Sequence, residues 1–180
     1  MKSIILGVTG SIAAYKAADI VSQLTKSEYA VQVVITKAGQ QFITPLTLQT
    51  LSKKQVFSEV FQEDDPSEVK HIALADSADM LVIAPASGNT INKIALGIAD
   101  DMLSCIALAM WEKPFVIAPA MNTRMYANPV VQGNLEILKK RGCTIVEPKE
   151  SLLACGDYGK GALADTNNII EAIKSVKLKK

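Results

Sequence analysis

Short apolar runs of strand length recur along this sequence, and segments with helical periodicity separate them. Five runs rich in Ile, Val and Leu have the character of buried strands, at residues 3–8, 30–36, 80–84, 115–118 and 143–146. Six other segments space their apolar residues as amphipathic helices do, at residues 11–26, 68–76, 89–99, 103–110, 129–140 and 167–176. Because strands that alternate with helices pair in parallel, the sequence predicts an α/β fold, a doubly wound parallel sheet in three α/β/α layers.

Two stretches make the alternation less regular. Residues 40–49 have helical composition but contain Pro45, which predicts an interruption at that position. Residues 55–65 fit neither pattern, and their acidic end at residues 63–65 predicts a solvated loop. Neither stretch shows the change of composition that marks a linker, so we expect a single domain over residues 1–180.

Composition limits the classes of protein to which this sequence can belong. The 180 residues are 49% hydrophobic and 21% charged, a balance that predicts a folded core rather than disorder. A formal net charge of +1 predicts no nucleic-acid surface, and the apolar runs are too short to span a membrane. The apolar start is too short for a signal peptide, and the three cysteines form no CxxC motif, so we expect a cytoplasmic protein.

A repeated VIAPA sequence marks the carboxyl ends of two predicted strands. It occurs at residues 82–86 and again at residues 116–120, followed by SGNT in the first copy and by MNTRM in the second. Because parallel strands end at the same edge of a sheet, we expect both copies to open into one site. Asn122 is the polar residue that the second copy places at this edge, between Met121 and Met125.

The turn after the first predicted strand has the composition of a phosphate site. GVTGS at residues 7–11 combines glycines with hydroxyl groups before a helix that Ser11 is expected to cap. The turn lacks the GxGxxG pattern, and Thr36 and Lys37 stand where an NAD site would place an acidic residue. This combination favours a mononucleotide. The alternative is an ordinary strand-to-helix turn with a serine cap.

A second turn of this kind is PASGNT at residues 85–90. Ser87 and Thr90 offer hydroxyl groups to a phosphate, and Asn89 offers an amide to a heterocycle. The alternative is a helix start at which the same residues serve only as caps. Further along, Asp100 and Asp101 precede a helical segment and are expected to cap it.

Two further residues are candidates for chemistry, and each has a structural alternative. His71 is the only histidine and lies early in a predicted helix, where it is either an acid–base group or a structural residue. Cys155 lies in a glycine-rich segment at residues 152–163, which predicts either a flap that closes over a ligand or a hairpin with an incidental thiol. With one histidine and no clustered thiols, no metal site is expected.

Five motifs, in this order, resemble those of the flavin-dependent cysteine decarboxylase family. They are GSIAAYK from Gly10, HIAL from His71, PASGNT from Pro85, PAMNTRM from Pro119 and LACGDYGKG from Leu152. Together they span nearly the whole chain, although each alone would be a weak signal. The resemblance implies a flavodoxin-like fold, FMN as the cofactor, and a homo-oligomer that is either a trimer or a dodecamer built from trimers.

The resemblance also assigns roles to residues of this chain. His71 matches the essential histidine of the family, usually described as the base, and Cys155 matches the flap cysteine that returns a proton. Asn122 matches the residue that grips the substrate carboxylate, and Met125 and Ala154 would also contact the substrate. The residues that would contact FMN are Gly10, Ser11, Ile12, Thr36, Ala38, Ser87, Asn89, Thr90 and Ala120.

The reaction implied by the resemblance is decarboxylation of 4'-phospho-N-pantothenoylcysteine to 4'-phosphopantetheine, a step of coenzyme A biosynthesis. Loss of CO₂ from an N-acylcysteine is difficult because the carbanion that remains has no electron sink. Oxidation of the neighbouring CH₂–SH group to a thioaldehyde by the flavin provides one. CO₂ then leaves to give an enethiolate, and the reduced flavin returns the hydride.

Three alternatives have the same fold: a peptidyl-cysteine decarboxylase, a flavin prenyltransferase, and a non-catalytic relative that binds a phosphatase. The PAMNTRM and LACGD motifs weigh against the prenyltransferase, and the lack of long acidic extensions weighs against the regulatory relative. Tyr126 stands where the family usually has Trp, and Ala162-Leu163 stand where many bacterial members have Arg-Met, which affects the expected substrate contacts. The sequence ends at Lys180, so we expect a free-standing decarboxylase without a fused synthetase domain.

Overall fold

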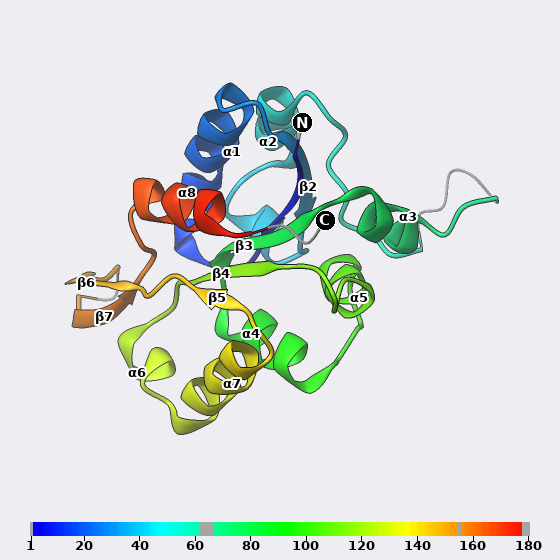
Figure 1. Ribbon diagram of the computed structural model, residues 1–180. Coiled ribbons are helices and arrows are strands. Elements are labelled where there is room, and N and C mark those ends of the chain that lie inside the picture. The colour runs from blue at the N-terminus through cyan, green and yellow to red at the C-terminus, as the bar shows by residue number, and fades with distance from the viewer. Residues whose placement is uncertain (1, 62–66, 155, 178–180) are drawn as a thin grey trace.

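A five-stranded parallel sheet is the centre of the computed structural model, which describes residues 2–61, 67–154 and 156–177 (Figure 1). The strands are β1 (Ser3–Val8), β2 (Ala30–Ile35), β3 (Met80–Ala86), β4 (Phe115–Pro119) and β5 (Thr144–Ile145). Their order in the sheet is β2-β1-β3-β4-β5, and every neighbouring pair is parallel. This order confirms the predicted doubly wound α/β fold and is that of flavodoxin-like proteins.

The central strands are buried on both faces, which explains why their sequences are almost entirely apolar. Successive side chains of β1 point to opposite faces, so Ile4 and Leu6 belong to one core and Ile5 to the other. All three are at most 1% exposed. Each such side chain contributes about 1.5–3 kcal/mol through burial, which makes β1 a rigid support for the turn that follows it.

Helices cover both faces of the sheet (Figure 1). One face packs against the 3₁₀ helix η1 (Ile12–Lys16), α1 (Ala17–Lys26), α2 (Pro45–Ser52) and α8 (Thr166–Ser175). The other face packs against α3 (Lys70–Ser77), α4 (Gly88–Leu96), α5 (Met102–Ala109) and α7 (Pro129–Lys140). Among the described residues, no helix combines the length and the hydropathy that crossing a membrane requires.

The structure corrects the prediction for residues 40–49. Pro45 does not interrupt a helix; it is the first residue of α2, and the preceding turn is a separate 3₁₀ helix, η2 (Gly39–Gln41). Proline suits this position because the first helical amide has no intrahelical partner to lose. The Thr44 side chain caps α2 by accepting a hydrogen bond from the amide of Thr47 at 3.3 Å.

The glycine-rich segment forms an antiparallel hairpin, β6 (Lys149–Leu152) and β7 (Tyr158–Ala162), outside the main sheet. Gly161 has φ of 155°, and a Cβ at this position would lie 2.4 Å from the carbonyl oxygen of Met121. The amide of Met121 donates to the carbonyl oxygen of Gly161 at 2.9 Å. The base of the hairpin therefore lies directly against the segment that follows β4.

A short extended segment borders the outer edge of β2. Phe57 pairs with this strand, because its amide donates to the carbonyl oxygen of Val33 at 3.2 Å and its carbonyl oxygen accepts from the amide of Ile35 at 2.9 Å. Phe57 belongs to the stretch at residues 55–65 that fitted neither pattern in the sequence. The acidic loop expected at residues 63–65 lies outside the described residues.

Candidate active site

The candidate site begins where the strand order reverses, between β1 and β3. Thr9 is fully buried between the turns that follow these strands. Its Oγ1 donates to the carbonyl oxygen of Pro85 at 2.7 Å and accepts from the amide of Ser87 at 2.8 Å. One hydroxyl group thus joins the two turns at the point where open α/β sheets bind their ligands.

Both turns lead into helices capped by serine. Ser11 Oγ accepts from the amide of Ala13 at 3.3 Å, which confirms the predicted cap. Ser87 Oγ accepts from the amide of Thr90 at 3.3 Å at the start of α4. The free amide groups of the first turn of α4 give this end a partial positive charge, which favours an anion.

A cavity of about 940 Å³ opens at this edge of the sheet. It lies near the upper end of the volumes of known ligand sites. The cavity is lined by every residue that the sequence resemblance assigns to FMN, namely Gly10, Ser11, Ile12, Thr36, Ala38, Ser87, Asn89, Thr90 and Ala120. The fold thereby brings together residues from four separate turns.

Close packing holds two of these turns together. A Cβ at Gly10 would lie 2.6 Å from the Cβ of Ala38, so only glycine permits this approach. The segment after β2 is ordered further by Thr36, whose Oγ1 accepts from the amide of Gly39 at 3.1 Å. Contacts within the chain therefore fix the shape of this wall of the cavity.

Asn122 lies at the same edge, after β4. The amide of Ala120 donates to the carbonyl oxygen of Ala86 at 3.0 Å, so the two VIAPA copies end side by side, as predicted. Asn122 caps α6 (Thr123–Tyr126), a short helix that the sequence did not predict, and its Oδ1 accepts from the amide of Arg124 at 2.8 Å. Asn122 and Met125 both line the cavity.

The hairpin contributes another wall of the cavity, through Leu152, Leu153 and Ala154. The amide of Leu153 donates to the carbonyl oxygen of Asp157 at 2.8 Å, which closes the turn between the two strands. Cys155, the predicted flap cysteine, lies outside the described residues. Its described neighbour Ala154 lines the cavity, so the predicted flap borders the same space as the turns after β1, β2 and β3.

Three side chains, Tyr126, Glu147 and Lys160, hold the hairpin to α6. The Tyr126 hydroxyl donates to Glu147 Oε2 at 2.9 Å, and Lys160 Nζ lies 2.8 Å from the same oxygen. Burial, together with the bond to Glu147, raises the pKa of Tyr126 to about 12. The hydrogen bond from Lys160 lowers the pKa of Glu147. Lys139 Nζ lies 3.4 Å from the other oxygen, Glu147 Oε1.

His71 stands apart from this cavity. It lies in the first turn of α3 and does not line the cavity. Its Nδ1 is buried and has no hydrogen-bond partner among the residues that the structure describes. The far end of α3 is fixed by Lys113, whose Nζ donates to the carbonyl oxygens of Ala75, Asp76 and Ala78 at 2.7, 3.0 and 2.7 Å.

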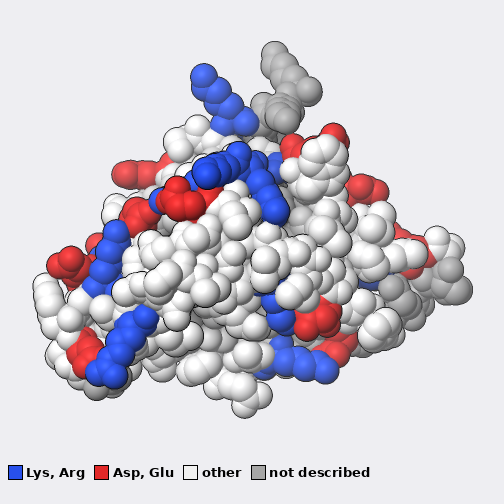
Figure 2. Space-filling model, turned by 90° about the horizontal axis from the view of Figure 1, so that it is seen from below, with Lys and Arg blue, Asp and Glu red and all other residues white. Residues whose placement is uncertain are grey.

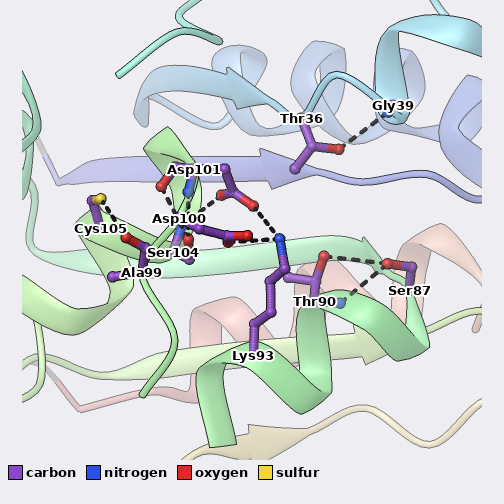
Figure 3. A network of polar contacts seen from close by, with 10 residues as sticks. All are labelled: Thr36, Gly39, Ser87, Thr90, Lys93, Ala99, Asp100, Asp101, Ser104 and Cys105. Atoms are coloured by element: carbon purple, nitrogen blue, oxygen red, sulfur yellow. Dashed lines mark hydrogen bonds and ion pairs between the residues drawn. The ribbon is translucent and has the colours of Figure 1, made fainter. Parts of the chain in front are cut away.

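An ion-pair cluster that the sequence did not predict lies on the cavity wall (Figure 3). Lys93 Nζ lies 2.7 Å from Asp100 Oδ1 and 3.2 Å from Asp101 Oδ2. The hydrogen bond with Asp100 raises the pKa of Lys93 and lowers the pKa of Asp100. Asp101 also caps α5, as expected, because its Oδ1 accepts from the amide of Ser104 at 2.9 Å.

The residues present fit a flavin mononucleotide. The start of α4 and the hydroxyl groups of Ser11 and Thr90 suit a phosphate. Gly10 and Ala38, packed against each other, place backbone of the turns after β1 and β2 on the cavity wall. Ile12 and Met121 add apolar surface for a flat heterocycle. The volume of the cavity leaves room for a second small molecule beside the nucleotide.

Fold and site together define a flavodoxin-like protein with a cavity suited to flavin. The model of the Flavoprotein family matches residues 1–177. This chain therefore belongs to the Flavoprotein family.

Two bacterial proteins are similar to almost the whole of this chain. A "Probable phosphopantothenoylcysteine decarboxylase" of Streptococcus mutans is 55% identical over 174 residues, which are 96% of this chain and 97% of that protein. A "Coenzyme A biosynthesis bifunctional protein CoaBC" of Bacillus subtilis is 44% identical over 170 residues, which are 94% of this chain and 42% of that protein. The chain thus spans nearly all of the first relative and less than half of the second.

Two solved structures have the same fold over nearly the same length. A mutant PPC decarboxylase complexed with pantothenoylaminoethenethiol superposes with a TM-score of 0.87 at 35% identity, covering 96% of each chain. The FMN binding protein AtHal3 superposes with a TM-score of 0.85 at 35% identity, covering 96% of this chain and 95% of that chain.

Proposed function

We propose that this chain catalyses the FMN-dependent decarboxylation of 4'-phospho-N-pantothenoylcysteine to 4'-phosphopantetheine, a step of coenzyme A biosynthesis. The observation that carries the proposal is a single cavity. It is lined by the turns after β1, β2 and β3, by Asn122 and by the hairpin. The identity of 55% with the Streptococcus mutans relative supports the same reaction. The cytoplasm is the expected location, because its reducing conditions keep the substrate thiol and Cys155 free.

FMN, when bound, supplies a two-electron acceptor that takes a hydride from the substrate carbon next to sulfur and later returns it. The chain's part is to hold this cofactor in one orientation. Ser11, Ser87 and Thr90 present hydroxyl groups, and the start of α4 presents amide groups, to its phosphate. Thr9 keeps the two turns at a constant spacing through its two buried hydrogen bonds.

Asn122 is proposed to bind the substrate carboxylate. Its amide can donate to a carboxylate without neutralising the charge, so the group remains able to leave as CO₂. The bond from the amide of Arg124 to Asn122 Oδ1 sets the orientation of this side chain. Asn122→Asp should reduce turnover at least a hundredfold, because it places like charge beside the carboxylate. A variant that keeps wild-type turnover would remove Asn122 from this role.

The hairpin is proposed to exclude water and to place Cys155 for the final protonation. Ala154 and Met125 lie on the cavity wall where the substrate would contact them. Cys155→Ser should still release CO₂ but should accumulate the enethiol product, since the last proton has lost its donor. Mass spectrometry of the reaction mixture distinguishes the two products. Release of fully reduced product at the wild-type rate would refute the assignment.

His71 is proposed to reach the cavity of a second copy, in a homotrimer or in a dodecamer built from trimers. The support is that His71 does not line the cavity of its own chain. The face on which α4 and α7 lie is broad and largely uncharged at its centre (Figure 2). Leu96 of α4 and Val130 of α7 are both 63% exposed, as expected of helices that contact another copy.

Mixing two inactive variants tests this assembly. His71→Asn and Asn122→Asp chains are unfolded together in equal amounts and refolded with FMN. If His71 acts in a neighbouring site, about a quarter of the sites in random trimers combine an intact histidine with an intact asparagine. Activity near one quarter of the wild-type value is therefore expected. Activity no higher than that of the separate variants would place both residues in one chain's site.

The reaction itself is tested by incubating the yellow, FMN-loaded protein with 4'-phospho-N-pantothenoylcysteine and following the products by liquid chromatography and mass spectrometry. Loss of CO₂ without an added oxidant is expected, because the flavin ends the cycle unchanged. A peptide ending in cysteine is the comparison substrate. If the protein decarboxylates the peptide but not 4'-phospho-N-pantothenoylcysteine, the substrate assignment is refuted. A colourless protein that binds no added FMN would refute the proposed function as a whole.

A further inference from the structure

Lys93, Asp100 and Asp101 form a charged cluster that the proposed reaction does not use. Figure 3 shows the Lys93 side chain extending from α4 to both carboxylates, at 2.7 and 3.2 Å. Gly97 ends α4 in the left-handed conformation, with φ of 74°, and so turns the chain back toward Lys93. The turn therefore places a lysine and two aspartates together although they are seven and eight residues apart in sequence.

All three residues line the flavin cavity. Lys93 lies one turn after Thr90 on α4, on the same wall as the residues expected to hold the phosphate. The Lys93 side chain is 19% exposed, whereas that of Asp100 is 58% exposed. The cluster's two carboxylates and one ammonium group give it a net charge of −1, and Lys16, Lys37 and Glu59 also line the cavity.

We infer that the Lys93–Asp100–Asp101 cluster sets the balance between oxidised and reduced flavin in this cavity. The inference rests on the proposed function, which places FMN there. Reduction of a flavin by two electrons with uptake of one proton adds one negative charge to it. The negative cluster opposes that added charge, and Lys93 limits the opposition by neutralising one of the two carboxylates.

Two substitutions change the charge of the wall in opposite directions. Lys93→Met leaves both carboxylates uncompensated, so it should disfavour reduced flavin. Asp100→Asn leaves Lys93 paired with Asp101 alone, so it should favour reduced flavin. A packing defect would not change sign in this way, because both variants break the same 2.7 Å ion pair. Asp100 serves well here because its exposed side chain makes the substitution easy to accommodate.

The size of the effect follows from Coulomb's law. For an assumed separation of roughly 10 Å between the charge that is removed and the flavin ring, and an effective dielectric constant of about 40, the ratio of reduced to oxidised flavin changes about fourfold. The ratio should fall about fourfold in Lys93→Met and rise about fourfold in Asp100→Asn. Lys93→Arg keeps the charge and should stay within about twofold of the wild-type ratio.

The experiment is an equilibrium titration of the FMN-loaded proteins with dithionite, at one pH and ionic strength, against a reference dye followed by absorbance. Lys139→Met is the matched control, since it removes a lysine of α7 that pairs with Glu136 and Glu147 but does not line the cavity. It should leave the ratio unchanged. Circular dichroism confirms that each variant is folded.

The outcomes separate the inference from the function beneath it. Opposite shifts in Lys93→Met and Asp100→Asn support the inference. Shifts in the same direction, or an unchanged ratio in Asp100→Asn, overturn it even if the protein is an active decarboxylase. If the Lys93→Met variant does not retain FMN, the direction in which Asp100→Asn changes the ratio of reduced to oxidised flavin decides whether the inference holds. Failure of the wild-type protein to bind FMN refutes the proposed function instead.

Discussion

Replacing Tyr126 with Phe removes one hydroxyl group and keeps the buried ring, so it isolates the bond between α6 and Glu147. Hydrogen bonds to charged groups contribute about 1.5–3 kcal/mol. Glu147 retains Lys160 and Lys139, so we expect the lower part of this range, about 1.5–2 kcal/mol at neutral pH. For a chain of this length, that loss lowers Tm by roughly 5 °C.

The pH dependence of this loss gives the sharper test. The folded-state pKa of Tyr126 is raised from 10.0 to about 12 because burial and Glu147 disfavour the phenolate. Because this pKa is raised, the stability that the protonated Tyr126 hydroxyl contributes is fully present below pH 10 and is lost as the pH rises toward 12. Wild-type protein should lose about 1.4 kcal/mol from this group by pH 11. The penalty of Tyr126→Phe should therefore shrink above pH 10 and reverse by about pH 12.

The measurement is urea denaturation followed by circular dichroism, at equal FMN loading, from pH 7 to pH 11. Lys139→Met is the control, because Lys139 pairs with the other oxygen of Glu147 and does not contact the Tyr126 hydroxyl. Its exposed ion pair should contribute less than about 1 kcal/mol at any pH. A Tyr126→Phe penalty that stays constant between pH 7 and pH 11, or is absent at pH 7, would refute the reasoning.

Three further substitutions probe the supports of the site. Thr9→Val leaves the carbonyl oxygen of Pro85 and the amide of Ser87 without their Thr9 partner, so urea denaturation should show a loss of about 2–4 kcal/mol in the free energy of unfolding. Fluorescence titration of the same variant should show FMN binding at least tenfold weaker. Gly161→Ala places a Cβ 2.4 Å from a carbonyl oxygen and should displace the hairpin, increasing its cleavage by proteases; Gly133→Ala, where a Cβ meets nothing within 4 Å, is its control. Lys113→Met frees three carbonyl oxygens at the end of α3 and should lower both stability, by about 2 kcal/mol, and turnover. Wild-type stability in Thr9→Val or Lys113→Met, or equal cleavage of the two alanine variants, would contradict the corresponding contact.

The sheet was predictable because its strands are signalled locally. Unbroken apolar sequence marks strands buried on both faces, and β1 and β3 are such strands. The helix starts were harder, because proline both ends and begins helices. Pro45 begins α2 since Thr44 caps it, and the composition of residues 40–49 does not distinguish the two cases. The helix α6 has only four residues, too few to show a period in the sequence.

The turns after β1 and β3 were predictable as parts of one site for a related reason, since glycines and hydroxyl groups after a strand are a local signal. The ion pair of Lys93 with Asp100 was not, because it depends on the backbone turn at Gly97. The placement of His71 away from the cavity also depends on packing that no short motif encodes. The roles assigned to His71 and Cys155 therefore remain predictions, and the mixing and product experiments test them.

The two borders of the sheet have a consequence for how copies of this chain can associate. β5 contains only two residues, so it offers little free backbone to an incoming strand. On the opposite border, Phe57 already occupies amide and carbonyl groups of β2. Neither border is suited to extending the sheet from one molecule into the next. Growth into fibres by strand addition is thereby discouraged, and contact between copies is left to side chains on helices and turns, where it can form a closed assembly.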